Sequence, residues 1–219
     1  MHSIKELQTI FKESIQDFKL NDYPAGLNSP VNYIMGLGGK RVRPVLVLAA
    51  CEAFEGDIHK AIKAALAIEL FHNFTLMHDD IMDNASLRRG KETVHEKYDL
   101  NTAVLSGDVM VIYAYQLLQD LDSAIFKKIF NIFNLTAVQV CEGQRLDLNF
   151  ETQEKVAIDE YIKMIEQKTA VLLGCSLKVG GFLAGTCDED AEDLYEFGRN
   201  LGIAFQIQDD ILDTFGDEK

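Results

Sequence analysis

Hydrophobic positions recur at helical spacing along almost the whole of this chain. All three prolines, Pro24, Pro30 and Pro44, lie at or before residue 44, and none follows. A sheet protein would show alternating β-branched runs closed by Asn-Gly turns, and the sequence contains no such runs. Because long proline-free segments with this spacing are typical of helices, the pattern predicts helices at residues 3–19, 29–36, 43–54, 58–83, 101–120, 123–149, 158–184 and 188–213.

Local signals indicate where these helices begin and end. Pro30 and Pro44 suit the first turn of a helix. Helix breaks are expected at 36–39, 55–56, 88–91 and 185–186, and N-caps at Asp57, Asn101, Asp122 and Asp188. No linker or low-complexity tract divides the chain, so we expect a single domain over residues 1–219. The length of the helices favours an all-α fold, an array of long antiparallel helices around a deep central cavity.

Composition narrows the classes of partner. Hydrophobic residues make up 47% of the chain, as in a globular protein. The net charge of −14 disfavours nucleic acid and anionic lipid as partners. In such an acidic chain, local basic groups suggest a small anionic ligand, although solvated loop charge would explain either group alone. One group is Lys40, Arg41 and Arg43, and the other is Arg88, Arg89 and Lys91.

Cysteine usage and hydropathy bear on location. The four cysteines are widely spaced and form no CxxC pair, which favours reduced thiols in a cytoplasmic protein over a metal or redox site. The apolar runs are too short for a transmembrane segment, and the N-terminus lacks the compact apolar stretch of a signal peptide. We therefore expect a cytoplasmic protein.

Two acidic motifs carry the strongest chemical signal. Residues 79–83 and 209–213 both read DDxxD, and each ends a long, apolar-rich predicted helix. The first and last Asp of each motif share one helix face, with Cβ atoms about 5–6 Å apart. Asp is a poor helix former, and the C-terminal end of a helix disfavours negative charge. Such a violation of local preference is typical of a functional site, whereas a single copy could simply be an acidic helix end.

The neighbouring carboxylates of each motif repel each other, and a divalent cation would offset this repulsion. Mg²⁺ prefers oxygen ligands and is usually held by one or two carboxylates together with substrate phosphates. The two motifs therefore predict a magnesium site that binds a diphosphate. Its candidate ligands are Asp79, Asp80 and Asp83 from the first motif and Asp209, Asp210 and Asp213 from the second.

Taken in order, the motifs resemble the trans-isoprenyl diphosphate synthases, the polyprenyl synthetase family of farnesyl and geranylgeranyl diphosphate synthases. The resemblance runs from about residue 28 to the end of the chain. It rests on GGKRVRP at 38–44, DDIMD at 79–83, RRG at 88–90, QKTA at 167–170 and FQIQDDILD at 205–213. The resemblance also implies further C-terminal helices, which we expect this chain to lack.

The resemblance implies a role for each matching residue. Asp79, Asp83 and Asp209 match the main metal ligands, with Asp80, Asp210 and Asp213 as lesser partners of about three Mg²⁺ ions. The groups expected to bind isopentenyl diphosphate are Lys40, Arg43, His72 and Arg89. Those expected to hold the allylic diphosphate are Arg88, Lys168 and Gln206. Lys168 and Thr169 also match the pair that faces the developing carbocation. Without these motifs, His72 would be taken for a core residue.

The implied reaction joins an allylic diphosphate to isopentenyl diphosphate. Mg²⁺ and the cations would stabilise the departing diphosphate, and a dry apolar cavity would protect the carbocation until the second alkene attacks. Two alternatives stay open. A terpene cyclase also uses DDxxD but has no need of a second diphosphate site. A non-catalytic subunit of a heteromeric synthase would be expected to lose its acidic motifs.

Product length and assembly give two further expectations. The growing chain should extend from Asp79 along its own helix, where Phe71, Phe74 and Thr75 are candidates for the floor of the pocket. Ordinary core packing is the alternative for all three. Because Thr75 is small, geranylgeranyl diphosphate is favoured over farnesyl diphosphate as product. We also expect a homodimer, because residues 101–118 and 124–140 are apolar around much of their circumference.

Overall fold

The computed structural model describes residues 1–215, which fold into two compact units. The first unit consists of Met1–Leu48 and Ile58–Leu121. The second consists of Ala49–Asp57 and the chain from Asp122 onward. Across residues 1–215, no helix combines the length and hydrophobicity needed to cross a bilayer. The prediction of an all-α fold is confirmed, whereas the central cavity stays a prediction.

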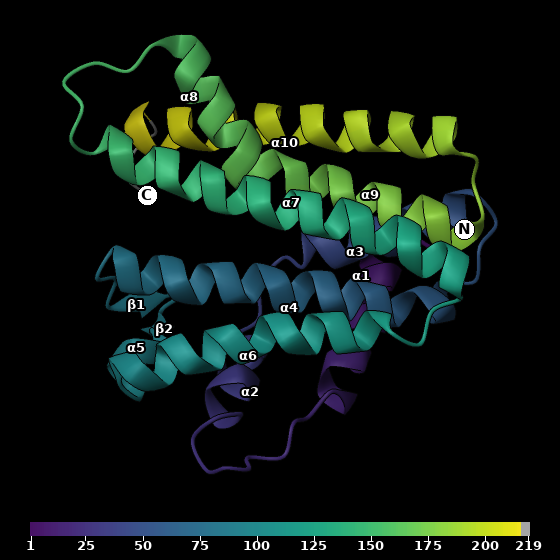
Figure 1. Cartoon of the computed structure of the whole chain (residues 1–219), viewed down its shortest axis with the longest axis horizontal. Helices are drawn as coiled ribbons and strands as arrows, with labels where there is room; N and C mark the ends of the chain where they lie inside the picture. The colour runs from purple at the N-terminus through teal and green to yellow at the C-terminus, as the bar shows by residue number, and fades with distance from the viewer. Residues whose placement is uncertain (216–219) are drawn as a thin grey trace. The chain divides into compact units, whose positions relative to one another are not determined.

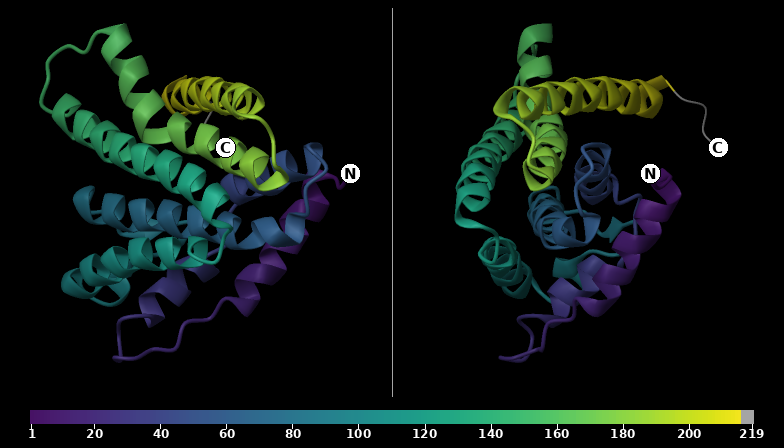
Figure 2. Two further views of the ribbon diagram at one scale, coloured as in Figure 1. Left: turned by 45° about the vertical axis from the view of Figure 1, so that its right-hand side comes forward. Right: turned by 90° about the vertical axis from the view of Figure 1, so that its right-hand side faces the viewer.

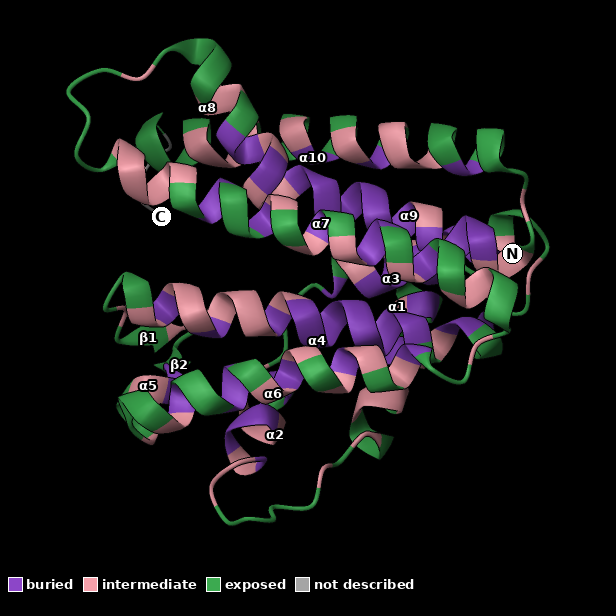
Figure 3. Cartoon of the chain, in the orientation of Figure 1, coloured by how far each residue is buried: buried purple, intermediate pink, exposed green. Residues whose placement is uncertain are grey.

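The first unit is built around helix α4 (Figures 1 and 2). Residues 64–71, in the middle of α4, are all buried, and Figure 3 shows this stretch in purple. Helix α6 packs along α4. The elements are α1 (Ile4–Asp17), α2 (Ser29–Gly36), α4 (Ile58–Met82), β1 (Leu87–Arg88), β2 (Lys91–Glu92), α5 (Val94–Lys97) and α6 (Leu100–Leu118); α3 (Val42–Ala53) begins here and ends in the second unit.

In the second unit, α9 is buried along most of its length between α7 and α10 (Figures 1 and 3). Helix α10 approaches α9 through small residues. A Cβ atom on Gly198 would lie 2.8 Å from the Cα atom of Gly174, so glycine is required for this close packing. The elements are α7 (Ser123–Phe150), α8 (Ile158–Ile165), the π-helical turn η1 (Glu166–Ala170), α9 (Val171–Ala184) and α10 (Asp188–Phe215).

The structure differs from the sequence prediction at several points, among them α5, which was not expected, and Asp188, which is the first residue of α10 and not its N-cap. The helix break expected at residues 88–91 is confirmed, and there β1 and β2 form a hairpin with a two-residue turn because Arg89 (φ 53°) and Gly90 (φ 73°) both adopt positive φ. The helix expected at 158–184 is interrupted by η1, which inserts an i→i+5 turn. Helix α6 is capped by the Asp99 side chain, which accepts from the Thr102 N–H, and not by Asn101. The predicted cap at Asp122 is confirmed, since its side chain accepts from the backbone N–H of Ala124.

Candidate functional site

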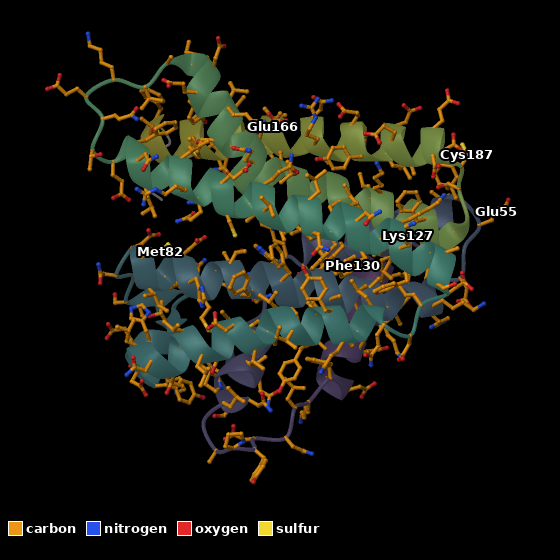
Figure 4. The ribbon with its side chains drawn as sticks, in the orientation of Figure 1. Glu55, Met82, Lys127, Phe130, Glu166 and Cys187 are labelled. Atoms are coloured by element: carbon orange, nitrogen blue, oxygen red, sulfur yellow. The ribbon has the colours of Figure 1, made fainter. Side chains whose placement is uncertain are left out.

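The first acidic motif lies at the C-terminal end of α4, next to Met82 in Figure 4. Asp79 is partly buried, and Asp83 is exposed just after the helix, where its N–H donates to the Asp79 carbonyl over 2.9 Å. Asp80 is 2% exposed and forms an ion pair with Arg88 of β1. Arg88 Nη2 donates to Oδ1 over 2.7 Å and Nε donates to Oδ2 over 2.8 Å. The pair therefore ties the cationic hairpin to the acidic end of α4.

A cationic group surrounds His72 in the same unit. Arg43 Nη1 donates to His72 Nε2 over 3.1 Å. Since a guanidinium can only donate, the imidazole accepts at Nε2 and carries its proton on Nδ1. Arg89 donates to the Gly38 carbonyl and so fixes the hairpin against the glycine turn. Lys40 is exposed, and its carbonyl accepts from the Gln8 side chain over 2.9 Å.

Burial and mutual repulsion set the electrostatics of this cationic group. Burial, and then Arg43 and Arg89, hold the pKa of His72 well below its usual range, so the ring is neutral at pH 7. Burial lowers the pKa of Arg43 to about 10 and also lowers that of Arg89. Arg43 Nε is buried with no hydrogen-bond partner among the described residues. The group is thus rich in unsatisfied positive charge, which an anion would stabilise.

A buried ion pair supports the basic loop, and sequence reasoning missed it. Arg41 has positive φ (51°) and is buried, and it donates to the Glu69 carboxylate and the Met35 carbonyl. Asn73, one turn along α4, donates to Glu69 Oε1 over 3.0 Å. Arg41 therefore points into the core, while Arg43 reaches His72. The feature of the sequence that could have indicated this pair is Glu69, a single acidic residue within the apolar stretch of α4.

The three candidate floor residues lie one to two turns before Asp79 on α4. Phe71 is buried, and its ring packs against Phe74 with centroids 5.6 Å apart. Phe74 also meets the His78 ring edge-on at 4.7 Å. The Thr75 hydroxyl donates to the His72 carbonyl over 2.8 Å. Phe74 and Thr75 are only partly buried. Their role in product length stays a prediction.

The second acidic motif lies near the C-terminal end of α10, in the second unit. Asp210 accepts from two neutral donors: Tyr161 Oη at 2.5 Å and Gln206 Nε2 at 2.8 Å. Burial, reinforced by the Asp210 carboxylate, raises the pKa of Tyr161 to about 12, so the phenol stays protonated and donates. Asp209 is partly buried and Asp213 is exposed. Within residues 1–215, neither side-chain carboxylate accepts a hydrogen bond.

The turn η1 presents three consecutive side chains to different partners; its first residue, Glu166, is labelled in Figure 4. Gln167 Nε2 donates to Glu142 Oε2 over 2.7 Å, and Lys168 Nζ donates to Asp147 Oδ2 over 2.5 Å, both across to α7. Thr169 Oγ1 donates to Gln206 Oε1 on α10 over 3.0 Å. A π-turn is often found at a functional site, and here it brings Thr169 to Gln206 while the neighbouring Lys168 pairs with Asp147.

The structure therefore assembles the predicted residues in two groups. The first unit holds the first motif with the basic groups, and the second unit holds the second motif with η1. Within residues 1–215, no three His, Cys, Asp or Glu side chains are close enough together to form a metal site by themselves. The metal assignments stay predictions. Sequence reasoning missed the partners of the expected residues, which are Glu69, Glu142, Asp147 and Tyr161.

Comparison with known proteins decides the family. Residues 24–219 match the family model described as polyprenyl synthetase. The chain belongs to the polyprenyl synthetase family. It is 41% identical over 198 residues to the geranylgeranyl diphosphate synthase of Methanosarcina mazei, covering 90% of this chain and 61% of that protein. It is 45% identical over 191 residues to the same-named enzyme of Saccharolobus solfataricus, covering 85% of this chain and 58% of that protein. The chain thus spans about three fifths of these relatives.

Solved structures of this family share the fold. A crystal structure of a geranylgeranyl pyrophosphate synthase matches with a TM-score of 0.97 and 50% identity, covering 100% of this chain and 67% of that one. A geranylgeranyl pyrophosphate synthetase from the archaeon Geoglobus acetivorans matches with a TM-score of 0.92 and 39% identity, covering 96% and 69%. The resemblance drawn from the sequence motifs is confirmed.

Proposed function

We propose that this chain is a short-chain trans-prenyltransferase, which condenses isopentenyl diphosphate with an allylic diphosphate and releases diphosphate. The observation that supports this most strongly is the cationic group of Arg43, His72 and Arg89 beside the Arg88–Asp80 pair. A diphosphate would supply the negative charge that this group lacks. The relatives named geranylgeranyl diphosphate synthases support geranylgeranyl diphosphate as the product.

The acidic motifs fit a magnesium site in this reaction. Asp83, Asp209 and Asp213 offer carboxylates with no hydrogen-bond partner in the described part of the chain, and such oxygens suit a hard cation. The two motifs, including Asp79, would bind about three Mg²⁺ ions in all, and these ions would stabilise the charge of the leaving diphosphate. Lys168 and Thr169 would lie next to the allylic diphosphate. A neutral His72 would donate to the second diphosphate through Nδ1–H.

A homodimer and a cytoplasmic location also belong to this proposal. Helix α6 carries large apolar side chains on its exposed surface, which a second subunit would cover. These are Leu100, Val104, Leu105 and Ile112, each at least 40% exposed. Light scattering that shows only monomer at micromolar concentration would contradict the dimer.

The test is an incubation of the purified chain with Mg²⁺, isopentenyl diphosphate and each allylic primer, followed by sizing of the products. We expect a product longer than the primer, and no turnover from the Asp79→Ala or Asp209→Ala variants, which should stay folded. A terpene cyclase would instead release diphosphate from the primer without isopentenyl diphosphate. A non-catalytic subunit would release none. Either result would contradict the proposal.

A further inference from the structure

A directed chain of hydrogen bonds ends on the Asp210 carboxylate. The Thr169 hydroxyl in η1 donates to Gln206 Oε1, and Gln206 Nε2 donates to Asp210 Oδ1. The Tyr161 hydroxyl, on the first turn of α8, donates to Asp210 Oδ2 over 2.5 Å. Both carboxylate oxygens therefore accept from donors of the same unit, one on α8 and one on α10. This arrangement fixes the side-chain rotamer of Asp210.

The nature of these donors distinguishes Asp210 from its counterpart in the first motif. Asp80 has both oxygens in an ion pair with Arg88, which neutralises its charge. Tyr161 and Gln206 carry no charge, so they orient the Asp210 carboxylate without a cation that compensates it. Each carboxylate oxygen has a second lone pair that remains open to a cation. An oriented but uncompensated carboxylate is suited to bind metal.

We propose that Tyr161 is a positioning residue for the second acidic motif: its hydroxyl holds the Asp210 carboxylate in the orientation that binds the metal–diphosphate complex. The inference rests on the proposed function, in which the second motif binds Mg²⁺. Tyr161 acts through Asp210 and touches neither substrate nor metal. It lies 49 residues before Asp210 in the sequence, and the fold of the second unit brings the two together.

The test replaces Tyr161 with Phe in the full chain, which removes the hydroxyl and keeps the ring. The control is Tyr113→Phe, because Tyr113 Oη makes a comparable bond of 2.9 Å to Asn28 Oδ1, away from either motif. The readout is the affinity for Mn²⁺ in the presence of inorganic diphosphate, measured by electron paramagnetic resonance. We expect Tyr161→Phe to weaken Mn²⁺ binding about tenfold, the scale typical of lost outer partners of metal ligands. Tyr113→Phe should leave the affinity unchanged.

A double-mutant cycle with Asp210→Ala separates positioning from a general loss of stability. If Tyr161 acts through Asp210, Tyr161→Phe should cause no further loss of Mn²⁺ affinity in the Asp210→Ala background. An equal loss in both backgrounds, unchanged affinity in Tyr161→Phe, or a wild-type chain that binds no Mn²⁺ with diphosphate would each overturn the proposal. A wild-type chain that binds Mn²⁺ and shows the expected cycle, yet extends no allylic primer, would overturn the proposed function alone.

Discussion

Replacing Gly143 with alanine would place a methyl group against the backbone of the π-helical turn. A Cβ atom at this position of α7 would lie 2.6 Å from the carbonyl carbon of Gln167 and 2.7 Å from the Cα of Lys168, with the Lys168 nitrogen closer still. Ordinary van der Waals contact begins near 3.4 Å. Because backbone atoms stand on the opposite side, no side chain can rotate away, and α7 and η1 would have to separate by about 1 Å.

The cost of this separation can be estimated from overpacked cores. Inserting a methyl group into a well-packed interior typically costs about 1–3 kcal/mol, and rigid backbone on the far side favours the upper end. For a chain of this length, about 3 kcal/mol lowers the melting temperature by roughly 6–12 °C. The same shift would move Lys168 away from Asp147, and a misplacement of about 1 Å at a reacting site can reduce the rate about a hundredfold.

Two assays test this reasoning: thermal unfolding followed by circular dichroism, and turnover with an allylic primer. The matched control is Gly36→Ala, because Gly36 is the last residue of α2 and a Cβ atom there meets nothing within 4 Å. That variant should melt at or slightly above the wild-type temperature, since alanine favours a helix by up to about 1 kcal/mol. A Gly143→Ala variant that melts within about 1 °C of wild type would refute the close approach.

Three further changes have defined outcomes. Glu69→Ala leaves the Arg41 guanidinium buried without its partner and should lower the free energy of unfolding by about 3–5 kcal/mol in urea titration. The depressed pKa of His72 means that the unfolded chain binds the proton more readily, so stability should fall as the pH drops below about 6.5, by up to about 1.4 kcal/mol per pH unit. His72→Gln should lack this component of the pH dependence. Thr75→Phe should shorten the product and Phe74→Ala should lengthen it, as measured by chromatography of the dephosphorylated alcohols.

A specific result would contradict each of these three predictions. For the buried pair, the control is the exposed pair of Lys63 and Asp120, where Asp120→Ala should cost less than about 1 kcal/mol; equal losses at both sites would contradict the reasoning. Identical stability–pH curves for wild type and His72→Gln would show that the imidazole has the same pKa in both states. An unchanged product from both pocket variants would place the floor elsewhere.

The long helices were predictable because few residues disturb them. The described helices that were expected begin and end within two residues of the predicted bounds, since proline, glycine and Asp122 mark their ends locally. The hairpin was missed because it depends on a positive φ at Arg89. Glycine or Asn at this position would have indicated such a conformation, whereas Arg rarely adopts it. The π-turn at Glu166–Ala170 was also missed, because its partners lie on α7 and α10 and nothing local requires it.

In the candidate site, too, some residues could be predicted from the sequence and others could not. The aspartates could be found because they break local rules at a helix end, and a single sequence displays such a violation. Their partners could not be found, because Tyr161 and Asp147 are ordinary residues for their own helices. Asp147 becomes a partner of Lys168 because Gly143 allows α7 to approach the backbone of η1. Tyr161 becomes a partner of Asp210 because the fold of the second unit brings α8 next to α10. Tertiary packing therefore determines which polar residues support the motifs.

The two DDxxD motifs have the same letters but different surroundings. In the first, the middle aspartate is 2% exposed and both its oxygens are bound by Arg88, so Asp80 holds the cationic hairpin in place. Because Asp80 is buried and Arg88 already compensates its charge, it attracts a cation less strongly than an unpaired carboxylate does. In the second motif, the neutral donors Tyr161 and Gln206 orient Asp210 and no described cation pairs with it. We therefore expect the first motif to bind metal mainly through its outer aspartates, whereas the second can also use its middle one.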